Sequence, residues 1–105
     1  MKIILDAIKI KATFKKDGMM RFISHLDFIR LIYRALRRAD IPFVLTQGFS
    51  PHPKVKFDTA LKLGVRGKMG VMFFLRTKMA LLEFKDKMDI QLNKDLRTID
   101  INYAE

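Results

Sequence analysis

Hydrophobic and polar positions alternate near the start of the chain. Between residues 8 and 15 the apolar residues Ile8, Ile10, Ala12 and Phe14 alternate with Lys9, Lys11, Thr13 and Lys15. A period of two places one set of side chains on each face of an extended segment. The pattern therefore predicts a β-strand over residues 8–15, with one apolar face and one cationic face.

A helical period follows this strand after a turn. Asp17-Gly18 has the composition of a turn, and Ser24 precedes Asp27 by three residues, as in a capping box. These signals predict a helix from about His25 to Ala39. Apolar residues recur in it at intervals of three and four, and we expect them to form its buried stripe: Leu26, Ile29, Tyr33 and Leu36.

The middle of the chain has the pattern of extended segments joined by turns. Pro42 cannot continue a helix, so residues 43–45 are expected to be extended. A glycine and two prolines mark residues 47–53 as an ordered loop or bulge. Apolar residues then alternate at Val55 and Phe57, and a second apolar run covers residues 71–75. These segments predict a hairpin whose strands are separated by the glycine-punctuated residues 64–67.

The C-terminal part repeats the order of helix and then strand. Four apolar residues at helical spacing predict a second helix over about residues 80–92: Leu81, Phe84, Met88 and Leu92. A last strand is predicted where apolar and polar residues alternate again: Ile99, Ile101 and Tyr103 with Thr98, Asp100 and Asn102. The resulting β-α-β-β-α-β order fits a ferredoxin-like α+β fold, an antiparallel sheet with both helices on one face. A length of 105 residues suits a single domain spanning residues 1–105.

Charge is the most unusual property of the composition. Lys and Arg number 21 against 11 Asp and Glu, so the formal net charge is +10. Such an excess attracts phosphate backbones or anionic lipid headgroups. The absence of cysteine excludes a disulfide framework, a thiolate zinc site and a Cys-ligated iron–sulfur cluster within this chain. No stretch approaches the ~20 apolar residues of a membrane-spanning helix. We expect a cytoplasmic protein without a cofactor or membrane contact, whose partner is a polyanion.

The predicted fold places several of the cationic residues on one face of the sheet. If both helices cover the face that holds Ile10 and Phe14, the other face is cationic, with Lys9, Lys11, Lys15, Lys54, Lys56 and Arg76. A neighbouring aromatic residue such as Phe74 could stack a base while the lysines contact phosphates, so RNA is the expected ligand. A standard RNA-recognition motif is disfavoured, because its characteristic aromatic pair is absent. The alternatives are a solvated face or one covered by a further domain.

The first predicted helix supplies a second candidate surface for nucleic acid. Its arginines recur at intervals of three and four, with a further one just upstream: Arg30, Arg34, Arg37 and Arg38, preceded by Arg21. Guanidinium groups offer planar, bidentate geometry for phosphate. Like charges at this spacing cost a few tenths of a kcal/mol, which a bound ligand would offset. The alternative is a solubilising face.

The two histidines are candidates for catalysis. His25 lies at a predicted helix start and His52 lies between two prolines. Together with an arginine they could form a phosphate site or a metal-independent endoribonuclease, because a histidine at a helix N-terminus is pushed toward its neutral form. Structural hydrogen bonding is the commoner role for such residues. A metal site of His25, Asp27 and His52 is chemically possible but lacks a spacing signature.

Two segments resemble the uncharacterised radical-SAM-linked protein family. One runs through Gly18–Asp27 and continues with Arg30, Arg34–Ala39 and Ile41-Pro42; the other is Gln47–Lys54 with Phe57. Ser24–Asp27 and Gly48–Pro53 match the family's signature positions. The resemblance is strongest over residues 8–65 and looser beyond them. Members usually continue further, so it implies a natural short form, a truncation or a divergent member.

The resemblance implies a domain found alone or behind a radical S-adenosylmethionine enzyme, with no assigned activity. The three-cysteine motif of such enzymes is absent here, so radical chemistry would belong to another polypeptide. Fold and basicity also resemble the CRISPR repeat-associated RNA-binding proteins, which is an analogy of architecture. Three functions stay open: an RNA-binding domain accessory to a separate radical SAM enzyme acting on RNA or a ribosomal substrate, an endoribonuclease, and a protein-interaction module. The sequence leaves the oligomeric state open.

Overall fold

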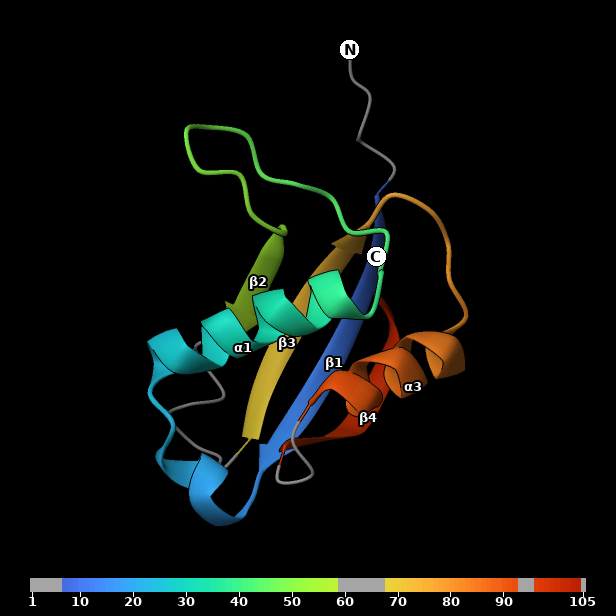
Figure 1. Cartoon of the computed structure of the whole chain (residues 1–105). Coiled ribbons are helices and arrows are strands. Elements are labelled where there is room, and N and C mark those ends of the chain that lie inside the picture. The colour runs from blue at the N-terminus through green and yellow to red at the C-terminus, as the bar shows by residue number, and fades with distance from the viewer. Residues whose placement is uncertain (1–6, 59–67, 93–95, 105) are drawn as a thin grey trace.

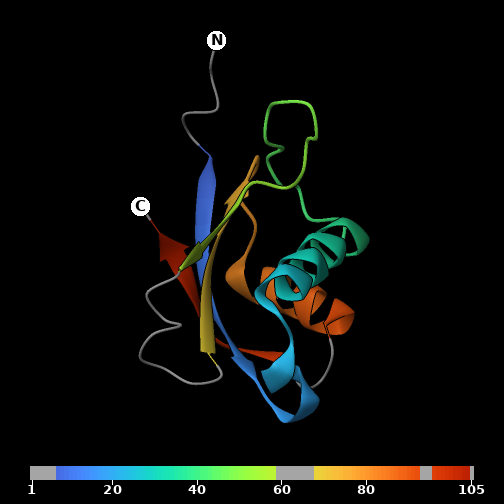
Figure 2. The same cartoon turned by 90° about the vertical axis from the view of Figure 1, so that its left-hand side faces the viewer.

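The chain forms a four-stranded antiparallel sheet with two α-helices on one of its faces (Figures 1 and 2). The structure, a computed structural model, describes residues 7–58, 68–92 and 96–104. The elements in chain order are β1 (Ile8–Lys16), the 3-10 helix η2 (Gly18–Phe22), α1 (His25–Arg38), β2 (Val55–Asp58), β3 (Lys68–Leu75), α3 (Leu81–Gln91) and β4 (Leu96–Ala104). The strands lie in the order β2-β3-β1-β4. The predicted β-α-β-β-α-β fold is confirmed, while the predicted 64–67 turn lies outside the described residues.

The alternation in β1 divides the sheet into two faces. Ile10, Ala12 and Phe14 are buried toward the helices, and β3 adds four buried residues on the same face: Met69, Val71, Phe73 and Leu75. Phe14 contacts Phe28 of α1 and Phe73 of β3 edge-on, with ring centroids 6.4 and 6.2 Å apart. Phe73 contacts Phe84 of α3 at 4.9 Å. These aromatic contacts join both helices to the sheet in one hydrophobic core.

Helix α1 begins as predicted but buries a different stripe. Its N-cap is Ser24, whose Oγ accepts a hydrogen bond from the backbone N–H of Asp27 at 3.1 Å. The buried residues are Phe28, Ile32, Ala35 and Leu36, whereas Leu26 is 54% exposed. The predicted stripe of Leu26, Ile29, Tyr33 and Leu36 was therefore wrong apart from Leu36. Apolar residues occupy two helical stripes here, and the one that contains Phe28 and the small Ala35 packs against the sheet.

Helix α1 ends in a Schellman motif. The N–H of Ile41 donates to the carbonyl of Leu36, and the N–H of Asp40 donates to that of Arg37, each at 3.2 Å. Asp40 takes the left-handed conformation that this motif requires, with φ of 57°. The chain then turns back toward the end of β3.

Strand β4 contains an irregularity that the sequence pattern did not predict. Its pairing with β1 shifts between Thr13 and Phe14, so Ile99 has no Cα partner in β1. Thr98 therefore faces the helices, where its hydroxyl donates to Asp89 of α3 at 2.9 Å. The predicted strand is therefore present, but Ile99 is 43% exposed whereas Ile101 packs against the core, so its alternating apolar residues do not all share one face.

Helix α3 is confirmed over nearly its predicted length. Phe84, Met88 and Leu92 are buried and Leu81 packs at the edge of the core. On its flank, Lys85 forms an ion pair with Asp89, Nζ to Oδ2, at 2.8 Å. The hydrogen bond and the charge of Asp89 raise the pKa of Lys85 above its ordinary value. No helix in the described part of the chain is long and apolar enough to cross a membrane.

Candidate nucleic-acid interface

Four lysines gather at one end of the open face of the sheet, the face that carries no helix. Lys9 and Lys11 belong to β1, Lys56 belongs to β2, and Lys54 immediately precedes β2. The register places Lys9 opposite Phe74 of β3, and it places both Lys11 and Lys56 opposite Met72. The lysine cluster, Lys9, Lys11, Lys54 and Lys56, therefore flanks two apolar side chains of the strand between them.

Phe74 lies between two of these ammonium groups. The Nζ of Lys54 is 4.8 Å from the centroid of its ring, and the Nζ of Lys9 is 5.9 Å away. Both distances are within the range of a cation–π interaction. Both ammonium groups lie over the ring, and the three groups together resemble the aromatic and cationic parts of single-strand binding surfaces.

A hollow of about 300 Å³ lies beside Met72 on the same part of the sheet. It is lined by Lys11, Lys56, Phe57, Asp58, Val71 and Met72. The lining combines three apolar residues, two lysines and one aspartate. Such a mixture can accept a flat, partly polar group while contacting an attached phosphate.

The lysines of the cluster form no ion pair within 4.0 Å in the described part of the chain, although Asp58 lines the same hollow as Lys11 and Lys56. At the opposite end of the sheet, Asp17 pairs with Lys15 at 3.9 Å and with Arg97 at 3.1 Å. Lys15, which was predicted to share the cationic face, is thus partly neutralised, and the available charge lies at the Phe74 end.

Arg76 was also predicted to lie on the cationic face. It follows the last residue of β3, and its Nε donates to the carbonyl oxygen of Phe43 at 3.2 Å. The side chain is exposed, but this hydrogen bond holds it at the end of the sheet. Arg76 borders the lysine cluster instead of contributing a fifth member to it.

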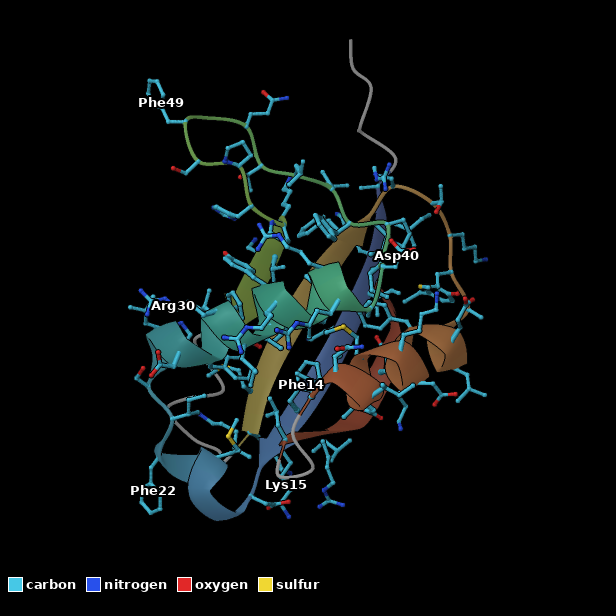
Figure 3. All side chains as sticks on the ribbon, viewed as in Figure 1. Phe14, Lys15, Phe22, Arg30, Asp40 and Phe49 are labelled. Atoms are coloured by element: carbon cyan, nitrogen blue, oxygen red, sulfur yellow. The ribbon has the colours of Figure 1, made fainter. Side chains whose placement is uncertain are left out.

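The arginines of α1 form a second cationic surface. Arg30, Arg34, Arg37 and Arg38 are all exposed. Arg30 lies 3.7 Å from Asp27, and no other described carboxylate pairs with these four arginines. Helical spacing places Arg30 and Arg37 on the side of α1 opposite the buried Phe28 stripe, and Figure 3 shows Arg30 in the N-terminal part of the helix. This surface and the lysine cluster therefore lie on opposite sides of the molecule, as Figure 2 shows for their elements. The side chain of Arg21 lies outside the described residues.

The two histidines contact different aromatic residues. His25, the first residue of α1, packs edge-on against Phe57 of β2 with centroids 5.7 Å apart. His52 stacks on Tyr33 at 5.1 Å and 20°, and its Nδ1 lies 3.1 Å from the carbonyl of Pro53. Tyr33 is eight residues beyond His25, about 12 Å along the helix axis. The structure therefore does not bring His25 and His52 together into one cluster.

The metal site considered from the sequence finds no geometric support. Within the described part of the chain, no group of three or more His, Cys, Asp or Glu residues is arranged to hold a metal ion. Asp27 instead uses its backbone N–H in the N-cap and its carboxylate beside Arg30. The Ser24–Asp27 segment thus starts α1, and His25 and His52 each contact an aromatic ring.

Several features of the surface were missed by sequence reasoning. The stacking of Tyr33 on His52 joins residues 19 positions apart, and the pairing of Asp17 with Arg97 joins the two ends of the chain. No local pattern signals either contact. Phe49 was noted only as part of a motif, but its side chain is fully exposed, at 106%. Its position between Gly48 and Ser50 in a proline-containing loop was the available signal.

Comparison with known proteins gave one match. A family model described as "Uncharacterized protein conserved in bacteria (DUF2344)" matches residues 9–105. That range includes the lysine cluster, the α1 arginines and both histidines. No curated protein and no solved structure matches the chain.

Proposed function

The chain belongs to the DUF2344 family of uncharacterized proteins conserved in bacteria, and we propose that it binds single-stranded RNA on the open face of its sheet. The observation that supports this most directly is the lysine cluster around Phe74 and Met72. It places an aromatic ring within 6 Å of two ammonium groups, with no described carboxylate paired to the cluster. A net charge of +10 would draw phosphate backbones to this surface.

The shape of the surface favours an unpaired strand over a duplex. Bases of a duplex are stacked on one another, so an aromatic ring can stack only on a base that is unpaired or at an end. Phe74 lies between Lys9 and Lys54, and the hollow beside Met72 lies between Lys11 and Lys56 on the same strands. A strand crossing β2, β3 and β1 would have one base at the ring and phosphates near the lysines on either side.

The cellular context remains a prediction from the sequence. A cysteine-free chain suits a reducing compartment, so cytoplasmic RNA is the expected ligand. The resemblance to radical-SAM-linked proteins suggests that the bound RNA or ribosomal substrate is delivered to a separate radical SAM enzyme. An endoribonuclease is the less favoured function, because His25 and His52 contact different aromatic residues.

The lysine cluster can be tested by removing two of its charges. The double variant Lys54→Gln/Lys56→Gln should bind a labelled single-stranded RNA of about 12 nucleotides roughly tenfold more weakly than the wild type. Each lost phosphate contact should also reduce the slope of log K against log salt by about 0.7, or about 1.4 for the pair. Fluorescence anisotropy between about 50 and 200 mM salt measures both quantities.

The matched control is Lys87→Gln on α3, where the lysine pairs with Glu83 at 3.5 Å. This variant should bind like the wild type. A wild-type protein that fails to bind at the lowest salt would refute the proposal, and so would an unchanged salt slope in the double variant. Single-stranded DNA and duplex RNA of the same sequence complete the series; equal affinity for the duplex would exclude base stacking at Phe74.

A further inference from the structure

Three residues of β3 point to the open face of the sheet, and their side chains become smaller along the strand. They are Phe74, Met72 and Gly70, which alternate with the residues of β3 that are buried toward the helices. Gly70 pairs with Asp58 of β2 on one side and with Thr13 of β1 on the other. Since glycine has no side chain, β3 places none between these two residues. The hollow beside Met72 lies on this part of the sheet and has Asp58 in its lining.

The hollow combines a hydrogen-bond acceptor with hydrogen-bond donors. Asp58 and Lys56 are two residues apart on β2, so both side chains point to the open face. Lys11 lies across Met72 from Lys56, because the register places both lysines opposite it. Asp58 is half-buried, whereas both lysines are exposed. A carboxylate has about four lone-pair sites, so Asp58 can accept from a ligand in addition to its interaction within the chain.

The size and position of the hollow suit one base of an RNA strand. Its volume of about 300 Å³ is at the lower end of the range for ligand pockets. Met72 provides a thioether, which packs favourably against aromatic rings. Phe74 is two residues from Met72, about 7 Å along the strand. A flexible single strand can therefore place one base on the ring of Phe74 and another in the hollow.

Hydrogen-bonding groups distinguish guanine from the other bases at such a hollow. Guanine presents two adjacent donors, N1–H and the N2 amino group, which match the two oxygens of one carboxylate. Its O6 and N7 accept from a lysine ammonium. Adenine and cytosine each offer the carboxylate a single amino group, and uracil offers a single N–H. The donor edge of guanine is accessible only when the base is unpaired, which agrees with a single-stranded ligand.

We propose that the hollow selects guanine, with Asp58 accepting from N1–H and the N2 amino group while Lys11 or Lys56 donates to O6 or N7. This inference rests on the proposed RNA binding and adds a base preference to it. The lysine cluster by itself attracts the phosphates of any sequence, because phosphate contacts carry no sequence information. Asp58 repels those phosphates, and its contact with a guanine compensates for that cost.

The test compares single-stranded RNAs of about 12 nucleotides that are uridine except at one central position. That position is guanosine, adenosine, cytidine, inosine or uridine. Wild-type protein should bind the guanosine RNA about tenfold more tightly than the all-uridine RNA in the anisotropy assay. Inosine lacks only the N2 amino group, so its RNA should bind roughly threefold more weakly than the guanosine RNA. This comparison leaves the protein unchanged and does not depend on the folding of a variant.

A pair of isosteric variants assigns the preference to Asp58. Asp58→Asn should reduce the preference for guanosine over uridine to less than about threefold, because the amide has one acceptor oxygen in place of two. It should not weaken binding of the all-uridine RNA. Asp100→Asn is the matched control: Asp100 lies opposite Thr13 on the same face and is exposed, but it does not line the hollow. This variant should keep the full preference.

The outcomes separate this inference from the proposed function. Salt-dependent binding of all the RNAs with equal affinity would overturn the guanine site and leave RNA binding intact. Failure to bind any of them would refute RNA binding itself, and the guanine site with it. Tighter binding of the adenosine or cytidine RNA, equal affinities for guanosine and inosine, or an undiminished preference in Asp58→Asn would each overturn the guanine site.

Discussion

Among the described residues, Asp40 is the only one other than glycine that has a positive φ, a sterically strained conformation. It has a φ of 57° at the end of α1, where glycine is the usual occupant because it has no Cβ. Its carboxylate also lies near the negative end of the helix dipole. The two hydrogen bonds of the Schellman motif cap the end of α1, and they offset the steric cost of the left-handed conformation of Asp40.

Glycine and alanine at position 40 should therefore change the free energy of unfolding in opposite directions. Asp40→Gly should raise the free energy of unfolding by about 0.5–1 kcal/mol, because the steric cost disappears and exceeds the added flexibility of the unfolded chain. Asp40→Ala should lower it by about 1 kcal/mol, because alanine lacks the polar side chain that tolerates this conformation. Urea unfolding measures both. A less stable glycine variant would mean that the Asp40 carboxylate makes a stabilising contact.

At the scale of elements, the rotation of α1 about its axis decides which side chains are available on the surface. With Phe28, Ile32, Ala35 and Leu36 against the sheet, all four arginines of α1 face solvent and Tyr33 meets His52. The same rotation leaves Leu26 exposed. The contact of the α1–β2 loop with Tyr33 and the exposure of the arginines therefore both depend on how this helix packs.

Two alanine substitutions can verify this rotation. Ile32→Ala should lower the free energy of unfolding by about 2–4 kcal/mol, because it removes a fully buried side chain from the core. Leu26→Ala should cost less than about 1 kcal/mol, since its side chain is already half solvated. Both positions are helical, so alanine is equally acceptable to the backbone at each. If denaturant unfolding showed Leu26→Ala to be the more destabilising variant, the stripe containing Leu26 would be the buried one.

On the scale of the whole molecule, positive charge is divided between two sides. The lysine cluster lies on the open face of the sheet, and the α1 arginines are exposed on the side of the helix away from its buried stripe. Figure 2 shows the sheet and the helices as two layers. Asp17 neutralises cations at the other end of the sheet. The positive charge of the described residues is thus presented mainly on two separate surfaces.

This division predicts that two variants losing the same charge from different surfaces differ in their affinity for RNA. Arg34→Gln/Arg37→Gln and Lys54→Gln/Lys56→Gln each remove two positive charges from a net charge of +10. The arginine variant should reduce affinity for single-stranded RNA less than about threefold, because salt screens exposed charges beyond roughly 8–10 Å. The lysine variant should lose about tenfold in the same anisotropy assay. Equal losses would show that RNA responds only to net charge.

Much of the architecture follows from local pattern alone. The alternation from Ile8 to Lys15, the Ser24 cap and the helical spacing of Phe84, Met88 and Leu92 identified their elements correctly, because backbone geometry translates each period into one face. The lysines of β1 were likewise placed on the open face. These predictions needed only the sequence neighbours of each residue.

The tertiary structure decided which side chains pack, pair or stack between segments that are far apart in the chain. Two apolar stripes of α1 could each have packed on the sheet, and the one containing Phe28 does so, with Phe28 in edge-on contact with Phe14 and Phe57. The shift in register of β4, the neutralisation of Lys15 by Asp17 and the stacking of His52 on Tyr33 likewise depend on how the elements pack. The sequence by itself determined the elements and their charged faces, because those depend on local periodicity. Which residues became accessible, paired or buried depended on the packing of segments far apart in the chain.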